Sequence, residues 1–266
     1  MTDPIDIAGT AAWPSPSPGP APRPRMVLAQ ARFEGWMLVR NGEQLLLTLI
    51  IPVLLLAAFS LEPLVKVGSS SRVNYLVPGI LALAVLSTAF TSQAIATGFE
   101  RRYGVLKRLG ATPLGRGGLI TAKTVTVLAV EAAQAVIIFA VGFGLGWHPH
   151  ATPFAAVWVV LLMLAGTAAF SGLGLLLAGT LRAEATLAAA NLLYLIMLGL
   201  GGIIFPLSKF PAPWRPVLTL LPPGALAQGL RSVLQSTTVL PLRDLAVLVV
   251  WAACAGAVAA RTFRWE

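Results

Sequence analysis

Residues 73–99 read VNYLVPGILALAVLSTAFTSQAIATGF, and this stretch contains no charged residue. A bilayer core of about 30 Å is crossed by a helix of roughly 20 apolar residues, so the stretch can span a membrane with some tilt. Charge-poor stretches of similar character recur along the chain. We therefore predict an all-α polytopic membrane protein with about six spans, at residues 44–61, 73–99, 124–147, 153–179, 185–205 and 243–260.

The composition indicates a lipid environment. Hydrophobic residues make up 57% of the 266 residues and charged residues only 11%, whereas a soluble domain carries about 25% charged residues. The net charge of +9 does not indicate a nucleic-acid partner, because the basic residues lie between apolar blocks and not among aromatic or polar base readers. Membrane lipid is the expected contact. The single cysteine, Cys254, lies in an apolar run and is predicted to be buried.

The chain before the first span divides into two parts. Residues 13–24 read WPSPSPGPAPRP, and because proline cannot donate a backbone hydrogen bond, we predict a disordered cytoplasmic tail over residues 1–25. A transmembrane domain is predicted over residues 26–266. Its first segment, residues 26–42, has the spacing of an amphipathic helix that lies in the membrane interface, with Arg32, Phe33 and Trp36 as candidate surface residues.

The segment between the fifth and sixth spans is unusual. Residues 209–243 are too apolar for an ordinary solvated loop, and they are interrupted too often for a single helix, by Pro211, Pro213, Pro216, Pro222 and Pro223. Irregular backbone is tolerated at membrane depth where protein buries it. The sequence therefore predicts a re-entrant segment before the last span.

The basic residues predict the orientation of the chain. With the amino terminus inside, thirteen of the nineteen Lys and Arg residues fall on the cytoplasmic side and six on the outer side. Cytoplasmic loops carry an excess of Lys and Arg. Both termini are therefore predicted to be cytoplasmic.

The most informative connection is residues 100–113, ERRYGVLKRLGATP, between the second and third spans. Four cations within eight positions alternate with apolar residues, and a glycine and a proline follow, which predicts a short amphipathic helix at the membrane surface. Two interpretations remain open. The cations fix topology by contacting lipid phosphates, or the helix docks a cytoplasmic partner and transmits its movement to the spans.

This connection resembles the cytoplasmic loop of permeases of the type-2 ATP-binding-cassette (ABC) exporter family, which includes drug-resistance exporters. A carboxylate, two arginines, an aromatic residue and a glycine are followed by LKRLGATP at residues 106–113. The resemblance extends over nearly the whole chain after Met26 and includes the glycine-rich fifth span, Pro206, and a later segment that ends near Arg231.

The resemblance implies that the chain is the permease domain of an exporter and that a separate ATPase subunit binds ATP-Mg. A second permease chain, in a homodimer or a heterodimer, would complete the substrate route. The residues implied to couple to the ATPase are Glu100, Arg101, Arg102, Tyr103, Leu106, Lys107 and Arg108.

No signal for independent catalysis is visible in the sequence. The closest match to a phosphate loop, GGLITAKT at residues 117–124, lacks the second glycine and opens an apolar span. His148 and His150 flank Pro149 in a short loop that offers too few ligands for a metal. We therefore predict that the chain is not an enzyme and binds no cofactor and no metal.

Several polar residues within the spans are candidates for a translocation path. Intramembrane carboxylates are costly and often functional, so Glu131 is a candidate, with Gln134 one helical turn away. A carboxyl hydrogen-bonded to a neighbouring helix is the competing interpretation. The second span adds Thr88, Thr91 and Ser92, for which helix packing is the competing interpretation.

The predicted function is export driven by the partner ATPase, and an apolar route fits amphipathic drugs or lipids. The alternative is an ion- or proton-coupled secondary transporter in which Glu131 is the coupling carboxylate, although that class often has an internal repeat and none is evident here. The cell membrane is the expected location, and the abundance of Ala, Gly, Leu and Arg is typical of a GC-rich bacterial genome.

Overall fold

The computed structural model describes residues 19–42, 46–61, 72–149, 154–235 and 240–263. Over these residues the chain is helical and contains no strand. The elements are α1 (Arg23–Arg40), η1 (Leu46–Ile50), α3 (Ile51–Leu61), α4 (Arg72–Val85), η2 (Leu86–Ser92), α5 (Gln93–Arg102), α6 (Val105–Gly110), α7 (Gly115–Gly144), α8 (Ala155–Thr180), α9 (Ala183–Leu200), η3 (Leu207–Lys209), α10 (Arg215–Leu220), α11 (Pro222–Gln235) and α12 (Leu242–Thr262).

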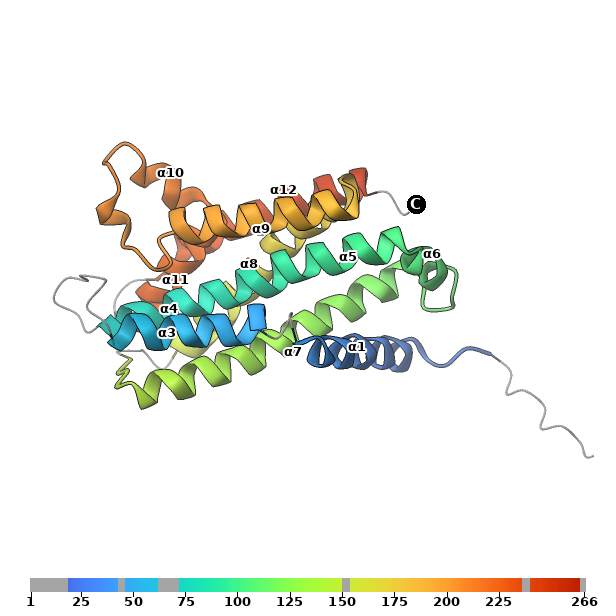
Figure 1. Cartoon of the computed structure of the whole chain (residues 1–266), viewed down its shortest axis with the longest axis horizontal. Coiled ribbons are helices and arrows are strands. Elements are labelled where there is room, and N and C mark those ends of the chain that lie inside the picture. The colour runs from blue at the N-terminus through green and yellow to red at the C-terminus, as the bar shows by residue number, and fades with distance from the viewer. Residues whose placement is uncertain (1–18, 43–45, 62–71, 150–153, 236–239, 264–266) are drawn as a thin grey trace, which may run out of the picture.

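The described residues contain five helices that are long and apolar enough to cross a bilayer. They are the continuous α4–η2–α5, then α7, α8, α9 and α12, and a shorter apolar helix covers Thr48–Leu61. These helices run along a common axis (Figure 1). The predicted all-α polytopic fold is therefore confirmed. The shorter apolar helix corresponds to the first of the six predicted spans, and residues 44–45 of that span lie outside the described residues.

The second predicted span is the centre of the bundle. α4, η2 and α5 follow one another without a break, and every residue from Tyr75 to Ala94 is buried. The surrounding helices α3, α7, α8, α9 and α11 all pack against this central helix. An apolar helix that is covered on all sides forms the core of a protein. The charge-free stretch therefore contacts other helices rather than lipid over most of its length.

Two prolines leave carbonyl groups that glutamines on other helices satisfy. Pro78 lies inside α4 and has no N–H to donate to the Asn74 carbonyl four residues earlier; Nε2 of Gln235 on α11 donates to that oxygen at 2.6 Å. Pro52 in α3 likewise has no N–H to donate to the carbonyl of Thr48, four residues earlier. That carbonyl accepts a hydrogen bond from Gln134 on α7. A π-helical turn, η1, lies directly before α3.

Helix boundaries differ from the predicted ones where glycine or proline controls the backbone. The fifth span ends at Leu200 and not at residue 205, because Gly202 has a φ of +64° that a helix cannot continue. The interfacial helix covers residues 23–40 and not 26–42, so residues 23–25 belong to it. Pro24 falls in its first turn, where a missing N–H costs nothing. Residues 1–18 of the predicted tail lie outside the described residues.

The third span and the cysteine also differ from prediction. α7 begins at Gly115, well before residue 124, because backbone hydrogen bonds extend the helix past the polar residues that precede its apolar part. Cys254 is exposed on α12. An apolar side chain gains nothing from burial in protein when its alternative is lipid, so an apolar run predicts membrane contact as readily as a core position.

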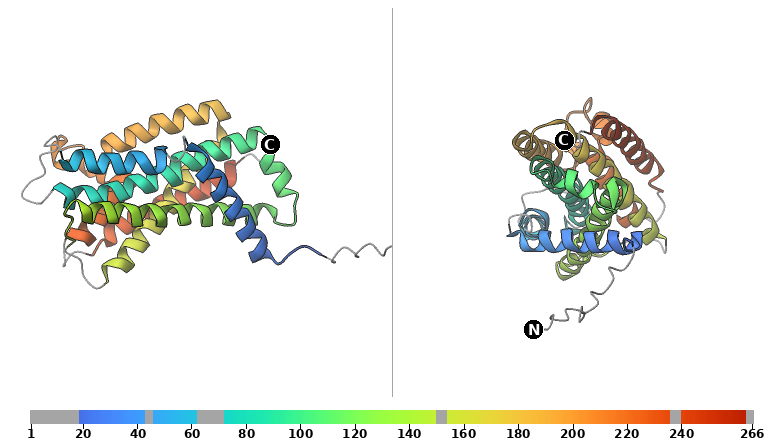
Figure 2. Two further views of the ribbon diagram at one scale, coloured as in Figure 1. Left: turned by 60° about the horizontal axis from the view of Figure 1, so that its bottom comes forward. Right: turned by 90° about the vertical axis from the view of Figure 1, so that its right-hand side faces the viewer.

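The two ends of the bundle differ in structure. At one end, α6 and the start of α7 project beyond the other helices, and α1 crosses the bundle obliquely (Figures 1 and 2). At the other end lie α10 and α11, in the position of the predicted re-entrant segment (Figure 1). α11 packs against α4, α8 and α12, and most of its residues are buried. Protein therefore covers α11, as the prediction requires of such a segment.

Candidate coupling surface

A left-handed glycine separates α5 from α6. Gly104 has a φ of +67°, a conformation that side chains other than glycine rarely adopt, so the chain turns sharply after Arg102. α6 then buries Leu106 at 2% exposure, whereas Lys107 is exposed. Tyr103, at the turn itself, is 62% exposed. The amphipathic helix expected from the sequence therefore buries one apolar residue and presents a basic and aromatic surface.

The seven predicted coupling residues fall into three groups. Glu100 and Leu106 point into the protein. Arg101 donates to the carbonyl of Leu181, and Arg102 pairs with Glu184 at the start of α9. Exposed at the α6 end are Tyr103, Lys107 and Arg108, and Arg108 donates to the Tyr103 carbonyl at 2.8 Å. We call this third group the α6 surface; Arg102 is also exposed, but its guanidinium is paired with Glu184.

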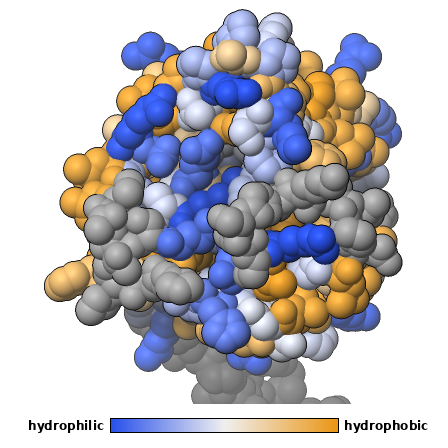
Figure 3. All heavy atoms as spheres, turned by 90° about the vertical axis from the view of Figure 1, so that its left-hand side faces the viewer, coloured by the Kyte–Doolittle hydropathy of each residue, from blue (hydrophilic) through white to orange (hydrophobic). Residues whose placement is uncertain are grey.

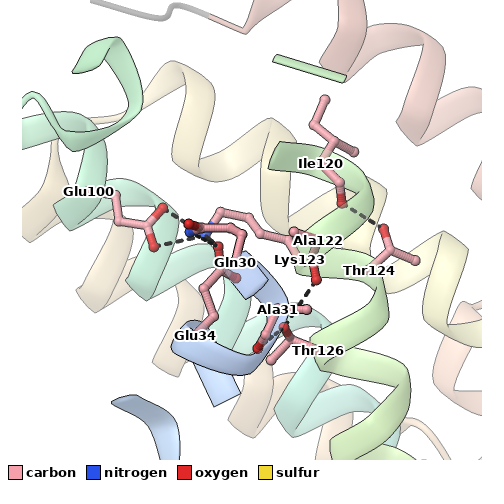
Figure 4. Close-up of polar contacts among 9 residues, drawn as sticks. All are labelled: Gln30, Ala31, Glu34, Glu100, Ile120, Ala122, Lys123, Thr124 and Thr126. Carbon is pink, nitrogen blue, oxygen red and sulfur yellow. Dashed lines mark hydrogen bonds and ion pairs between the residues drawn. The ribbon is translucent and has the colours of Figure 1, made fainter. Parts of the chain in front are cut away.

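Lys123 links three helices beneath the α6 surface (Figure 4). Its Nζ lies 2.7 Å from Oε2 of Glu100 on α5 and 3.5 Å from Oε1 of Glu34 on α1, and Lys123 itself belongs to α7. Gln30, one turn before Glu34, donates to Glu34 at 3.0 Å. Burial raises the pKa of Glu34, and the charge of Lys123 opposes that rise. We call Lys123, Glu100 and Glu34 the lysine cluster.

The lysine cluster determines which face of α1 meets the protein. Glu34 faces Lys123 on α7, and the carbonyl of Ala31 accepts a hydrogen bond of 3.1 Å from Thr126 on the same helix. The predicted interfacial residues Arg32, Phe33 and Trp36 are exposed. α1 therefore directs polar groups toward the bundle and large apolar groups away from it, an arrangement that a membrane surface would cover.

Sequence reasoning missed Lys123 and Glu34. The sequence places Lys123 among the cytoplasmic cations, directly before the span at residues 124–147, and Glu34 on the polar side of the segment at residues 26–42. A signal was present, because Glu34, Glu100 and Lys123 all lie at the predicted cytoplasmic ends of their segments. The pairing itself could not be deduced, since it depends on the angle at which α1 crosses α7.

An open groove of about 370 Å³ lies beside the α6 surface. One wall is the start of α1 and the other is the connection from α6 to α7, and the lining is mostly apolar: Met26, Ala29, Gln30, Leu109, Thr112, Pro113 and Leu114. The α6 surface and this groove together give the α6 end both a basic and an apolar recognition element.

The predicted translocation residues all lie within the packing of one chain. Thr88 and Gln134 are hydrogen-bonded to each other at 3.0–3.1 Å, and Glu131 accepts a 2.5 Å hydrogen bond from Thr167 on α8. All five predicted residues, which are Thr88, Thr91, Ser92, Glu131 and Gln134, are buried. Their role in a translocation path stays a prediction, and the contacts described here are helix-packing contacts.

Comparison with known protein families gives a match over residues 27–234 to the family described as ABC-2 type transporter. The chain belongs to the ABC-2 type transporter family. The match begins in α1 and ends in α11, so it includes the lysine cluster, the α6 surface and the buried segment before α12. A comparison with curated proteins gave no match.

Membership in the ABC-2 family establishes the general role of the chain. It is a multi-pass membrane protein and a permease component of an ABC transporter. This role agrees with a fold whose described residues include five helices long and apolar enough to cross a bilayer.

Proposed function

We propose that this ABC-2 permease is the membrane subunit of an exporter and that a separate ATPase subunit, which binds ATP-Mg, docks on the α6 surface. The observation that carries the proposal is the exposure of Tyr103, at the turn after α5, and of Lys107 and Arg108 on α6, which projects beyond the spans at this end. Aromatic residues and arginine are enriched in protein interfaces, and complementary charges across an interface guide association. The adjoining groove offers an apolar complement to these residues.

The contacts around α6 provide a route for movement into the spans. α6 is joined through Gly104 to α5 and through Gly115 to α7, and both glycines have left-handed backbones that allow a sharp turn. The lysine cluster links both of these helices to α1. Arg102 and Glu184 link α5 to α9. A displacement of α6 by the ATPase would therefore move four helices together.

Two permease chains are expected to enclose the substrate route, in a homodimer or a heterodimer. Large apolar side chains of α9 and α12 are exposed on a single chain, among them Leu192, Leu195, Val249 and Val250. Lipid or a second chain would cover these faces. A route between such faces suits amphipathic drugs or lipids. The distribution of Lys and Arg supports cytoplasmic termini in a bacterial cell membrane, with the α6 end inside.

Co-purification tests the docking of the ATPase. The tagged chain is extracted in mild detergent, and the proteins that accompany it are quantified by mass spectrometry. An ATPase subunit in stoichiometric amount is expected with the native chain, and Lys107→Glu is expected to reduce it several-fold, because the charge reversal opposes a surface that complements the cation. Arg261→Glu is the matched control, since Arg261 is an exposed cation near the carboxyl terminus.

Two results would contradict the proposal. Recovery of the native chain as a stable oligomer without an ATPase would remove its main support. Equal recovery of the ATPase with the native chain, Lys107→Glu and Arg261→Glu would show that the partner binds elsewhere.

A further inference from the structure

Arg231 is a partly buried cation at the α11 end of the bundle. Its guanidinium donates three hydrogen bonds to backbone carbonyls: to Gly202 at 2.7 Å, to Ile203 at 2.6 Å and to Tyr75 at 3.3 Å. The guanidinium also lies 3.7 Å from the centroid of the Tyr75 ring, within the range of a cation–π interaction. One side chain on α11 therefore contacts α4 and the chain that follows α9.

Two of the three carbonyls that Arg231 contacts belong to residues 201–205, which we call the α9 turn. α9 ends at Leu200, and the last carbonyls of a helix have no partner within it and carry its negative dipole end. The left-handed Gly202 directs the chain toward η3, so its carbonyl and that of Ile203 need donors from elsewhere. A fixed cation is well suited to such a cluster of carbonyl oxygens.

All described hydrogen bonds from the α9 turn to other helices depend on two side chains. Arg231 donates to two of its carbonyls, and the hydroxyl of Tyr75 donates to Gly202 at 3.2 Å. Backbone hydrogen bonds in the turn are local, from Gly201 to Met197 of α9. Apolar packing supplements these bonds, because Ile203 and Ile204 are buried in the core. The polar attachment of this turn is thus concentrated at one place.

Close approach between α4 and the α9 turn requires a glycine. A Cβ on Gly79 would collide with the carbonyl oxygen of Ile203 and would lie 2.8 Å from Nη2 of Arg231. The absence of a side chain at Gly79 therefore lets the turn lie against α4, where Arg231 can reach it.

We propose that Arg231 is a positioning residue that closes the α11 end of the transporter by holding the α9 turn against α4. Hydrophilic residues occupy much of the centre of this end, with hydrophobic residues toward its sides (Figure 3). Release of the Arg231 contacts frees the α9 turn from α4 and α11 without unfolding a helix. The role of Arg231 in the transport cycle rests on the proposed export function, in which substrate leaves at the end opposite the ATPase.

Thiol labelling measures this closure without the ATPase. Cys254 is the single native cysteine, so Cys254→Ser gives a cysteine-free chain in which Ile204→Cys places one thiol on the α9 turn. Ile204 is 5% exposed, so its replacement is expected to react slowly with a maleimide added to broken membranes, where both ends of the protein are accessible. Arg231→Met is expected to increase the labelling rate by roughly tenfold or more, because several hydrogen bonds to a charged group are lost.

A second variant opens the α9 turn without removing the charge. Gly79→Ala places a methyl group against the Ile203 carbonyl and is expected to increase labelling of the Ile204→Cys thiol in the same direction. Arg231→Lys, which keeps the charge but lacks the planar fork, is expected to label at an intermediate rate.

Two control positions distinguish opening of the turn from unfolding. Phe205→Cys, at a position that is 46% exposed, should label rapidly in every background, and Ala169→Cys, in the fully buried part of α8, should stay unlabelled. Slow labelling at Ile204→Cys in both the Arg231→Met and Gly79→Ala backgrounds would overturn the proposal. Equal labelling at Ala169→Cys and Ile204→Cys would also overturn it, because Arg231 would then support the whole bundle. The labelling result does not depend on ATPase co-purification, so either proposal can fail alone.

Discussion

Replacing Lys123 by methionine is the sharpest test of how α1 is attached. The substitution keeps an unbranched side chain but leaves Glu34 and Glu100 facing each other without a cation. The three side chains are only 10%, 14% and 25% exposed for Lys123, Glu34 and Glu100. Removal of one partner from a buried ion pair typically costs about 3–5 kcal/mol. We expect about 3 kcal/mol here, because both carboxylates keep some contact with water.

Hydrogen exchange of the α1 amides measures this cost. A loss of about 3 kcal/mol corresponds to roughly a hundredfold increase in the opening of α1, with a similar increase in exchange of its amides. Amides of α12 provide the internal control, since α12 packs mainly against α8 and α11. The triple variant that adds Glu34→Gln and Glu100→Gln should recover most of the protection, because no unpaired charge remains.

The pH dependence of exchange follows from the raised pKa of Glu34. A carboxyl whose pKa is higher in the docked state binds more protons when docked, so docking of α1 is most favourable at low pH. It weakens as pH rises from the ordinary glutamate value of 4.5 through the raised value. The loss of α1 protection in Lys123→Met should likewise become larger as pH rises. Unchanged α1 protection in Lys123→Met, or no recovery in the triple variant, would show that the lysine cluster does not hold α1 against the bundle.

Four further substitutions test the interior and the α6 end. Gln134→Leu should destabilise the protein in detergent by roughly 1–3 kcal/mol, because the Thr48 carbonyl and the Thr88 hydroxyl lose their hydrogen bonds to Gln134, and Pro52→Ala should restore part of the melting temperature by returning an N–H. Glu131→Gln should leave ATP-driven transport intact, measured in vesicles with the partner ATPase; abolished transport would instead support coupling through the carboxyl. Arg102→Ala should change the melting temperature little, because exposed ion pairs contribute less than about 1 kcal/mol.

The spans were predictable because apolar length is a local property of the sequence. The stretch at residues 73–99 identified the central helix to within a few residues, since no charge interrupts it. The end of α9 was placed too late because the left-handed backbone of Gly202 depends on Arg231 and Tyr75, which lie far away in the sequence. The start of α7 was placed too late because helical hydrogen bonding continues through polar residues.

The candidate site was predicted in outline but not in its internal contacts. The pattern of cations and leucines at residues 100–113 predicted a surface helix, and the structure has α6 there. The sequence could not separate the exposed Lys107 from Arg101, whose partner is the Leu181 carbonyl, because successive charges on a short turn look alike until their neighbours are known. For the same reason, the sequence could not show which face of α1 packs against the bundle, because that depends on where Lys123 lies in the fold.

The glutamines that satisfy the carbonyls freed by proline have a consequence for biosynthesis. The Thr48 carbonyl finds its donor 86 residues later in the chain, and the Asn74 carbonyl finds its donor 161 residues later. At roughly 5–20 residues per second, the second interval lasts about 8–30 s. During that time the nascent central helix carries an unsatisfied polar group, which disfavours its release into lipid. The early helices are therefore expected to stay beside the insertion machinery until α11 has been synthesised.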